Sequence, residues 1–265
     1  MPLLDPVALR PLLGAYAGRF DVDALAICDS TSSELLRRAD AGAPSGSVLV
    51  ADAQTAGRGR RGRNWLSAPA DSLTFSLLWR FPGSPLQLSG LSLAVGVALA
   101  RALAGLGAHG VGLKWPNDVL LRRAGEFAKL AGILIEMASD RRGTQVVIGV
   151  GLNLRAPDAV PGQPAAGLVD ALASGELPER HVLFAALLVE LAQVLDAFTV
   201  DGFAGQKNEW QRWHAWQDEP VRVVEDGREL LAGTCIGADL DGSLLVRGES
   251  GVERVLAGDV SLRHG

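Results

Sequence analysis

The run Gln54-Thr55-Ala56-Gly57-Arg58-Gly59-Arg60-Arg61-Gly62-Arg63-Asn64-Trp65 separates two apolar parts of the chain. Four arginines and three glycines fall within seven positions, between Ser47–Val50 and Trp65-Leu66. Closely spaced glycines bring no side chain to bury, so they do not build a packed element. The run therefore predicts a mobile, positively charged surface loop. Guanidinium groups and exposed glycine amides both suit phosphate oxygens, so we expect the loop to order around an anionic ligand.

Other kinds of loop share parts of this composition. Arg-Gly clusters occur in RNA-binding tails, but this cluster does not repeat and sits inside a folded pattern. A P-loop needs Gly-Lys-Ser/Thr at a helix start, and no such tripeptide follows. A solvated loop without a role would leave four like charges without a compensating partner. Phosphate binding is the interpretation that the residues favour.

The whole chain has the composition of a globular protein. Its 265 residues, 48% hydrophobic and 21% charged, allow one large domain or a large and a small one. The net charge of −5 argues against a DNA-binding protein and favours a small anionic ligand for the local positive charge. Cys28 and Cys235 match no metal or redox spacing, so we expect reduced thiols in a cytoplasmic protein. We expect neither a signal peptide nor a membrane span.

Outward from the loop, strands and helices mix without regular alternation. The polar run Asp29–Ser33, followed by Glu34, is typical of a helix start. Further helices are expected at Pro6–Gly18, Leu86–Leu106, Arg180–Phe198 and Phe203–Trp216. Strands are expected at Val22–Cys28, Ser47–Ala53, Ser72–Trp79, Val111–Lys114, Val119–Leu121, Leu130–Met137 and Gln145–Leu154. The last two should form a hairpin across Ser139-Asp140-Arg141-Arg142-Gly143. The pattern predicts an α+β fold with a mixed or antiparallel sheet.

The character of the chain changes after Glu219. Short strands are expected at Val221–Val224, Glu229–Gly233, Ser243–Val246 and Val252–Leu256. Asp226-Gly227 and Asp241-Gly242 between them are tight-turn signals. A β module of this size has little core of its own, so we expect it to pack on the main domain. The predicted domains are residues 1–217 and 218–265.

Three further motifs carry polar groups at strand ends. Lys114-Trp115-Pro116-Asn117-Asp118 is either a turn with flanking charges or a device that holds Lys114 and Asp118 near a strand end. In the strand from Lys129 to Glu136, alternation predicts that Lys129, Ala131, Ile133 and Ile135 share one face. Lys129 is then either a snorkelling surface residue or a charge aimed into a pocket. Gly149-Val150-Gly151-Leu152-Asn153 is either a bulged strand or a place where a flat ring meets the backbone.

In this order and at this spacing, the motifs resemble those of the biotin protein ligases along roughly Asp29–Leu154, and the C-terminal module looks like the SH3-like cap of that family. The resemblance implies a catalytic domain of the class II synthetase type. It implies that biotin and MgATP form biotinyl-5′-AMP, and that a lysine of the biotin carboxyl carrier protein of acetyl-CoA carboxylase then takes the biotin. Biotin and MgATP would be substrates, without a permanently bound cofactor.

The resemblance also implies roles for individual residues. Lys129, Arg58 and Arg60 would be catalytic. Biotin would contact Ser30, Thr31, Ser32, Gln54, Gly57, Arg58, Gly59, Arg60, Lys129 and Gly132. ATP and the adenylate would contact Arg63, Trp65, Lys114, Asn117, Asp118, Gly149, Gly151 and Asn153. Asp118 is the candidate Mg²⁺ ligand and the candidate general base. Ser32 stands where the family more often has Asn or Gln, and the segment Arg123–Ala128 is expected to be an enlarged hairpin tip.

The residues before Ser30 are too few for the DNA-binding domain that some family members carry, so we expect a ligase that is not a repressor, binds neither DNA nor membrane, and is a monomer or a homodimer. A lipoate ligase or octanoyltransferase is the nearest alternative. A ligand-binding protein without catalytic activity is the alternative from another class.

Overall fold

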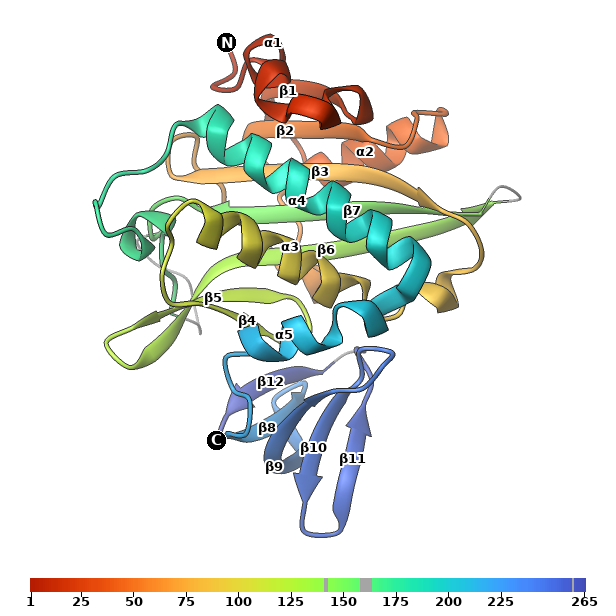
Figure 1. Ribbon diagram of the computed structural model, residues 1–265, viewed down its shortest axis with the longest axis vertical. Coiled ribbons are helices and arrows are strands. Elements are labelled where there is room, and N and C mark those ends of the chain that lie inside the picture. Colours follow the sequence, from red (N-terminus) through yellow and green to blue (C-terminus); the bar gives the residue numbers. More distant parts are fainter. Residues whose placement is uncertain (141–142, 158–163, 259) are drawn as a thin grey trace.

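The computed structural model describes residues 1–140, 143–157, 164–258 and 260–265. A seven-stranded sheet in the order β1-β2-β3-β7-β6-β5-β4 forms its larger part (Figure 1). The strands are β1 Asp21–Cys28, β2 Ser47–Gln54, β3 Ser72–Phe81, β4 Val111–Lys114, β5 Asp118–Arg123, β6 Glu126–Asp140 and β7 Gly143–Asn153. Only the pair β1 and β2 is parallel among these strands. The predicted α+β class with a mixed sheet is therefore confirmed.

The long hairpins of the sheet agree with the prediction. β6 pairs antiparallel with β7 out to Asp140 and Gly143, while Arg141 and Arg142 of the predicted turn lie outside the described residues. β5 and β6 meet at a tight turn in which Ala124 and Gly125 both have positive φ. The expected enlarged tip at Arg123–Ala128 is thus a continued ladder, in which Arg123 pairs with Glu126.

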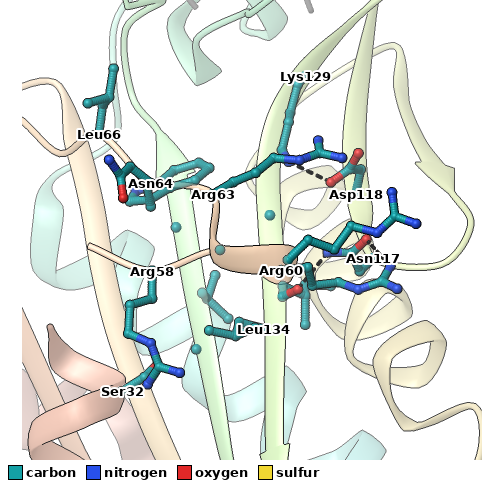
Figure 2. Close-up of a pocket in the computed structure, with 18 of the residues that line it drawn as sticks. Ser32, Arg58, Arg60, Arg63, Asn64, Leu66, Asn117, Asp118, Lys129 and Leu134 are labelled. Atoms are coloured by element: carbon teal, nitrogen blue, oxygen red, sulfur yellow. Dashed lines mark hydrogen bonds and ion pairs between the residues drawn. The ribbon is translucent and has the colours of Figure 1, made fainter. Parts of the chain in front are cut away.

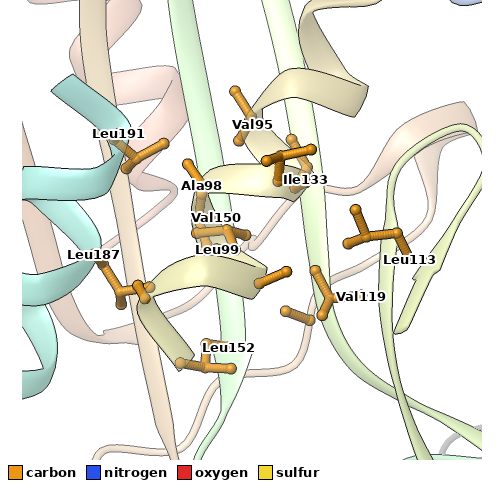
Figure 3. Close-up of a cluster of buried hydrophobic side chains, with 14 of the residues drawn as sticks. Val95, Ala98, Leu99, Leu113, Val119, Ile133, Val150, Leu152, Leu187 and Leu191 are labelled. Atoms are coloured by element: carbon orange, nitrogen blue, oxygen red, sulfur yellow. The ribbon is translucent and has the colours of Figure 1, made fainter. Parts of the chain in front are cut away.

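Helices cover both faces of this sheet. α2 Thr31–Asp40 buries Leu35 and Ala39 on one face, in a small cluster with Leu49 of β2. On the other face, α3 Leu91–Gly105 and α4 Arg180–Asp201 pack on each other and on the sheet (Figure 3). Val95, Ala98 and Leu99 of α3 meet Ile133, Val150 and Leu152, with Leu187 and Leu191 of α4 beside them. Each fully buried aliphatic side chain contributes about 1.5–3 kcal/mol, so this layer holds the sheet rigid beneath the site.

Three helices begin or end differently from the prediction. The predicted helix Leu86–Leu106 is wrong at its start, because a short 3-10 turn at Pro85–Leu88 precedes α3. Gly90 has φ 79°, and a methyl group there would lie 2.6 Å from the side chain of Phe203, so the chain turns at this glycine. Pro6–Gly18 is α1 Pro6–Leu9 followed by the 3-10 segment Arg10–Arg19, which is kinked at Gly14. Only Lys207–Trp213 of the last predicted helix is α-helical, and it forms α5.

Within the described residues, two helical segments are long and apolar enough to cross a membrane by length and composition alone: Pro85–Gly105 and Arg180–Gly205. In the structure, 67% and 56% of their most apolar windows are buried inside the fold. Packing between α3, α4 and the sheet accounts for their apolar composition.

A second, five-stranded antiparallel sheet follows, in the order β11-β10-β9-β8-β12. Its strands are β8 Pro220–Glu225, β9 Arg228–Ala238, β10 Leu244–Gly248, β11 Gly251–Val255 and β12 Ser261–His264. Asp226 and Gly227 both have positive φ between β8 and β9, as a tight hairpin turn requires. The strand β12 was not predicted, and the SH3-like form of this module stays a prediction.

The small sheet packs under β4 and α5, as predicted (Figure 1). Trp115, fully buried after β4, donates its indole N–H to the carbonyl of Gly242 at 3.0 Å. The hydroxyl of Ser89 donates to the carbonyl of Asp241 at 2.6 Å. The two sheets therefore share one hydrophobic core, and the last strand is brought to the edge of the cavity described next.

Candidate functional site

A cavity of about 830 Å³ opens between β3, β6 and β7 on one side and the arginine–glycine segment on the other. Its volume is within the range of small-molecule sites. The turn after β4 and the residues of β12 complete its wall. Figure 2 shows the segment Arg58–Leu66 crossing over the strands, so the predicted surface loop covers a cavity.

One end of the cavity is lined by neutral hydroxyl and amide groups. Ser30 caps the N-terminus of α2, and the next residue, Thr31, donates its backbone N–H to Oε1 of Gln54 at 2.7 Å. The hydroxyl of Ser76 donates to that of Thr31 at 2.9 Å and lies 3.0 Å from that of Ser32. These buried groups can both donate and accept, so this end suits a neutral polar ligand group such as a urea.

The indole ring of Trp65 lines the cavity and lies against the backbone of β6 and β7. A methyl group at Gly151 would lie 2.2 Å from Cε2 of its indole, and one at Gly132 would lie 3.3 Å from Cζ3. Gly151 is therefore required for the ring to reach the backbone of β7, and Gly132 leaves it room beside β6. Nε1 of Trp65 is buried without a hydrogen-bond partner among the described residues.

Two lysines and one aspartate form a buried charge cluster at the other end. Nζ of Lys129 is 2.6 Å from Oδ1 of Asp118, and Nζ of Lys114 is 3.5 Å from Oδ2. Burial lowers the pKa of the Lys114 ammonium, and Asp118 only partly offsets this effect. Burial raises the pKa of Asp118, but the two lysines outweigh burial and hold it below its usual range. The cluster carries a net positive charge and faces the cavity, so it suits an anion.

Lys129 reaches the cavity through a bulge in β6. The ladder pairs Val119 with Ala131 and Leu120 with Lys129, which leaves the buried Leu130 as an extra residue. A bulge shifts the alternation of side chains by one position. The prediction that Lys129 and Ala131 share a face is therefore wrong: Ala131 joins the core, whereas Lys129 lies beside Gly132 on the cavity side.

The arginines of the loop point to opposite sides of the cavity (Figure 2). Arg60 donates to Oδ1 of Asn117 at 3.0 Å and to the carbonyl of Gly258 at 2.5 Å. Asn117 in turn donates its amide to the carbonyl of Ile133 at 2.8 Å, which fixes it on β6. Arg58 instead donates to Oε1 of Glu136 at 2.7 Å and to the hydroxyl of Ser33 at 3.3 Å.

Known proteins share this arrangement of motifs and fold. The profile of the biotin/lipoate A/B protein ligase family matches residues 26–153. The chain is 34% identical over 268 residues to the bifunctional ligase/repressor BirA of Escherichia coli (strain K12), covering 98% of this chain and 80% of that protein. It belongs to the biotin/lipoate ligase family.

A biotin–[acetyl-CoA-carboxylase] ligase of Mycobacterium tuberculosis is 43% identical over 197 residues, 72% of this chain and 70% of that protein. A biotin protein ligase from Aquifex aeolicus, solved with biotin and ATP, has a TM-score of 0.77 at 28% identity, covering 92% of this chain and 99% of that chain. The resemblance that the motifs indicated is confirmed by these comparisons.

For this ligase-family chain, the structure brings nearly all of the predicted site residues to one cavity. Gly57 is the exception, since it does not line the cavity and instead accepts a hydrogen bond from the backbone of Trp65 at 2.9 Å. Gly149 lies at the hydroxyl end, where a methyl group would be 2.5 Å from Oγ of Ser32, and not beside the Trp65 ring. Asn153 is fixed by a 3.3 Å hydrogen bond from its amide to the carbonyl of Lys129.

Sequence reasoning missed two residues of β3: Thr74, which lines the cavity, and Ser76, which supports the cavity wall through its hydrogen bonds to Thr31 and Ser32. It also missed the β12 residues Ser261 to Arg263, which line the cavity. The alternation of side chains along β3 could have indicated that Thr74 and Ser76 face the site, whereas no local sequence pattern predicts β12.

Both oxygens of Asp118 are already paired with lysines, which does not favour the predicted role of Asp118 as metal ligand or general base. Among residues 1–140, 143–157, 164–258 and 260–265 there is no group of three or more His, Cys, Asp or Glu side chains that could hold a metal ion.

Proposed function

We propose that this chain joins biotin to ATP as biotinyl-5′-AMP and then transfers the biotin to a lysine of the biotin carboxyl carrier protein of acetyl-CoA carboxylase. The observation that carries the proposal is a cavity that has neutral hydroxyl groups at one end and the Lys129–Asp118–Lys114 cluster at the other. A ureido ring suits the first end, and a carboxylate meeting a phosphate suits the second. The names of the M. tuberculosis and A. aeolicus relatives support the same substrates.

In the first step, an oxygen of the biotin carboxylate attacks the α-phosphorus of ATP, and the bond to pyrophosphate breaks. Two anions must approach, so the reaction depends on positive charge held in place. Lys129 is positioned by Asp118 at the end of the cavity, and Arg60 and Arg63 approach the same end from the loop. Preorganised donors of this kind are each worth about 3 kcal/mol of transition-state stabilisation. Mg²⁺ would enter as part of the substrate MgATP and neutralise its phosphate oxygens.

The ring of Trp65, seated on the backbone of Gly151, offers a flat surface for adenine, with Asn153 and Asn117 at its border. Nζ of Lys114 lies 5.4 Å from the ring centre of Trp216 and 3.5 Å from Oδ2 of Asp118, so both neighbours help to hold its charge at the cavity wall. We assign biotin to Ser30, Thr31, Ser32, Gln54 and Gly132, and the nucleotide to Trp65, Gly151, Asn153, Asn117 and Arg63. Asp118 then orients Lys129.

In the second step, the amine of the acceptor lysine attacks the acyl carbon of the mixed anhydride, and AMP leaves. The adenylate reacts with water, so it must be covered until the carrier arrives. The segment Arg58–Leu66 crosses the cavity and supplies that cover.

We further propose the division into residues 1–217 and 218–265, an SH3-like form for the second, and action in the cytoplasm without specific DNA binding. The described helices before β1 are α1 and the 3-10 segment Arg10–Arg19, and both pack on α4. These two segments do not form the pair of helices with which a helix-turn-helix domain binds the DNA major groove. A DNA fragment bound in a sequence-specific way by residues 1–265 would contradict this part of the proposal.

Biotin-dependent exchange of labelled pyrophosphate into ATP tests the first step. We expect exchange with biotin and none with lipoate. Exchange with lipoate alone would assign the chain to the lipoate branch of the family, and exchange with neither would indicate a binding protein without catalytic activity.

A further inference from the structure

The guanidinium group of Arg58 is held on the outer side of the loop by Glu136. Nη2 of Arg58 is 2.7 Å from Oε1 of Glu136, and Nη1 is 3.3 Å from the hydroxyl of Ser33 on α2. Figure 2 shows Arg58 running toward Ser32, away from Arg60 and Arg63. Arg58 therefore joins the loop to two elements of the rigid scaffold, and its charge is directed away from the Lys129 cluster.

Glu136 is placed on β6 for this contact. It lies on the same side of the strand as Gly132 and Leu134, both of which line the cavity. Four residues along a strand span about 13 Å, so Glu136 stands well beyond Gly132, at the rim. Its side chain is 19% exposed, and its Oε2 is buried without a hydrogen-bond partner among the described residues. A half-sheltered carboxylate of this kind is stabilised by a cation that stays beside it.

The other side of the loop is fastened independently. Arg60 donates to Asn117 and to the carbonyl of Gly258. Figure 2 shows Arg60 and Asn117 on the opposite side of the view from Arg58 and Ser32. The loop is thus tied down on both sides, and between these ties it carries Gly59 over the cavity.

We propose that Glu136 is a positioning residue whose ion pair with Arg58 latches the loop closed over the adenylate. Arg58 acts as an anchor in this assignment, and the chemistry is left to Lys129, Arg60 and Arg63. The inference rests on the proposed function, because it names the group that retains the intermediate of that reaction. Opening the loop requires this pair to separate, so its loss accelerates escape of the adenylate more than it slows its formation.

The expected size of the effect follows from the exposure of the pair. Arg58 is 45% exposed, which weakens the attraction, but Glu136 is sheltered and the hydrogen bond is charge-assisted. We expect Glu136→Ala to release the adenylate about three- to tenfold faster. Glu136→Gln keeps an acceptor oxygen without the charge and should fall between this variant and the wild type.

The experiment loads the full chain with biotin and MgATP in the presence of pyrophosphatase, removes free ligand, and follows loss of adenylate from the protein with time. Asp196→Asn is the matched control, because it breaks the ion pair with Arg19, 2.8 Å long and distant from the cavity. We expect faster release in Glu136→Ala and unchanged release in Asp196→Asn. The rate of pyrophosphate exchange should change less than twofold in both variants. Without ligand, the melting temperatures of both variants should match that of the wild type.

Equal release rates in Glu136→Ala and the wild type would overturn the latch. A fall in exchange as large as the rise in release would also overturn it, because Glu136 would then support formation of the adenylate and not its retention. If the wild type itself showed no biotin-dependent exchange, the proposed function would fail, and that result is distinct from either outcome for the latch.

Discussion

Removing the ammonium group of Lys129 should impair the chemistry far more than the fold. In Lys129→Ala, Asp118 loses its partner at 2.6 Å and keeps only Lys114 at 3.5 Å. The side chains of Lys129 and Asp118 are 23% and 11% exposed, so solvent screens the pair only in part. A hydrogen bond to a charged group of this kind contributes about 2 kcal/mol to the free energy of unfolding.

That loss predicts a fall in melting temperature of about 4–8 °C for a chain of this size. The expected effect on adenylate formation is larger. Loss of one preorganised donor to developing charge lowers the rate by about 10²–10³-fold. Lys129→Ala should therefore remain folded at 25 °C and lose nearly all biotin-dependent pyrophosphate exchange.

Two controls make the result interpretable. Lys207→Ala removes a lysine of α5 that does not line the cavity and should leave exchange unchanged. Ser89→Ala removes the hydrogen bond to the carbonyl of Asp241 at a residue that does not line the cavity, and should lower stability by about 1 kcal/mol. The reasoning is refuted if Lys129→Ala exchanges pyrophosphate at the wild-type rate, or if Ser89→Ala loses as much exchange as Lys129→Ala.

Two further outcomes follow from the geometry. Gly151→Ala would place a methyl group 2.2 Å from Trp65, so the ring must move and the KM for ATP should rise at least about tenfold. Gly248→Ala is the control, because its methyl group has no neighbour closer than 3.7 Å, and it should leave the KM for ATP unchanged. Equal KM values in the two variants would show that Trp65 does not shape the nucleotide site. The pKa of Asp118 is held below its ordinary value of 3.8, so its ionised form stabilises the fold above that value and this stability is lost as the pH falls through the lower folded pKa. Urea unfolding between about pH 5 and pH 2 should therefore show a shallower loss for Asp118→Asn than for the wild type, and parallel curves would contradict the assignment.

Local chemistry made much of the fold predictable. The Ser30 cap, the Asp226-Gly227 turn and the alternating strands follow from backbone preferences that act within a few residues. The start of α3 did not follow from them, because Gly90 turns the chain in response to Phe203, more than a hundred residues away. The strand β12 was missed because its pairing with β8 is a tertiary contact.

The sequence predicted most of the residues that line the cavity, but it predicted less well which way their side chains point. Lys129 lines the cavity, but the prediction placed it on the same strand face as Ala131. That prediction missed the bulge at Leu130, because the bulge depends on how β5 pairs with β6. Gly57 was assigned to biotin because it belongs to the motif, but it lies outside the cavity lining, where its backbone meets that of Trp65 too closely for a side chain. Glu136 was not selected, because its significance comes only from Arg58 on a distant segment. Motifs identify which residues gather, whereas pairing between strands decides where each one points.

Transfer to a carrier tests the central claim most directly. The chain is incubated with biotin, MgATP and a biotin carboxyl carrier domain, and the carrier is analysed by mass spectrometry after proteolysis. We predict biotin on a single carrier lysine, dependent on ATP and absent when Lys129→Ala replaces the wild type. A carrier that stays unmodified while the chain forms biotinyl-5′-AMP, or a carrier that takes lipoate in place of biotin, would contradict the proposed function.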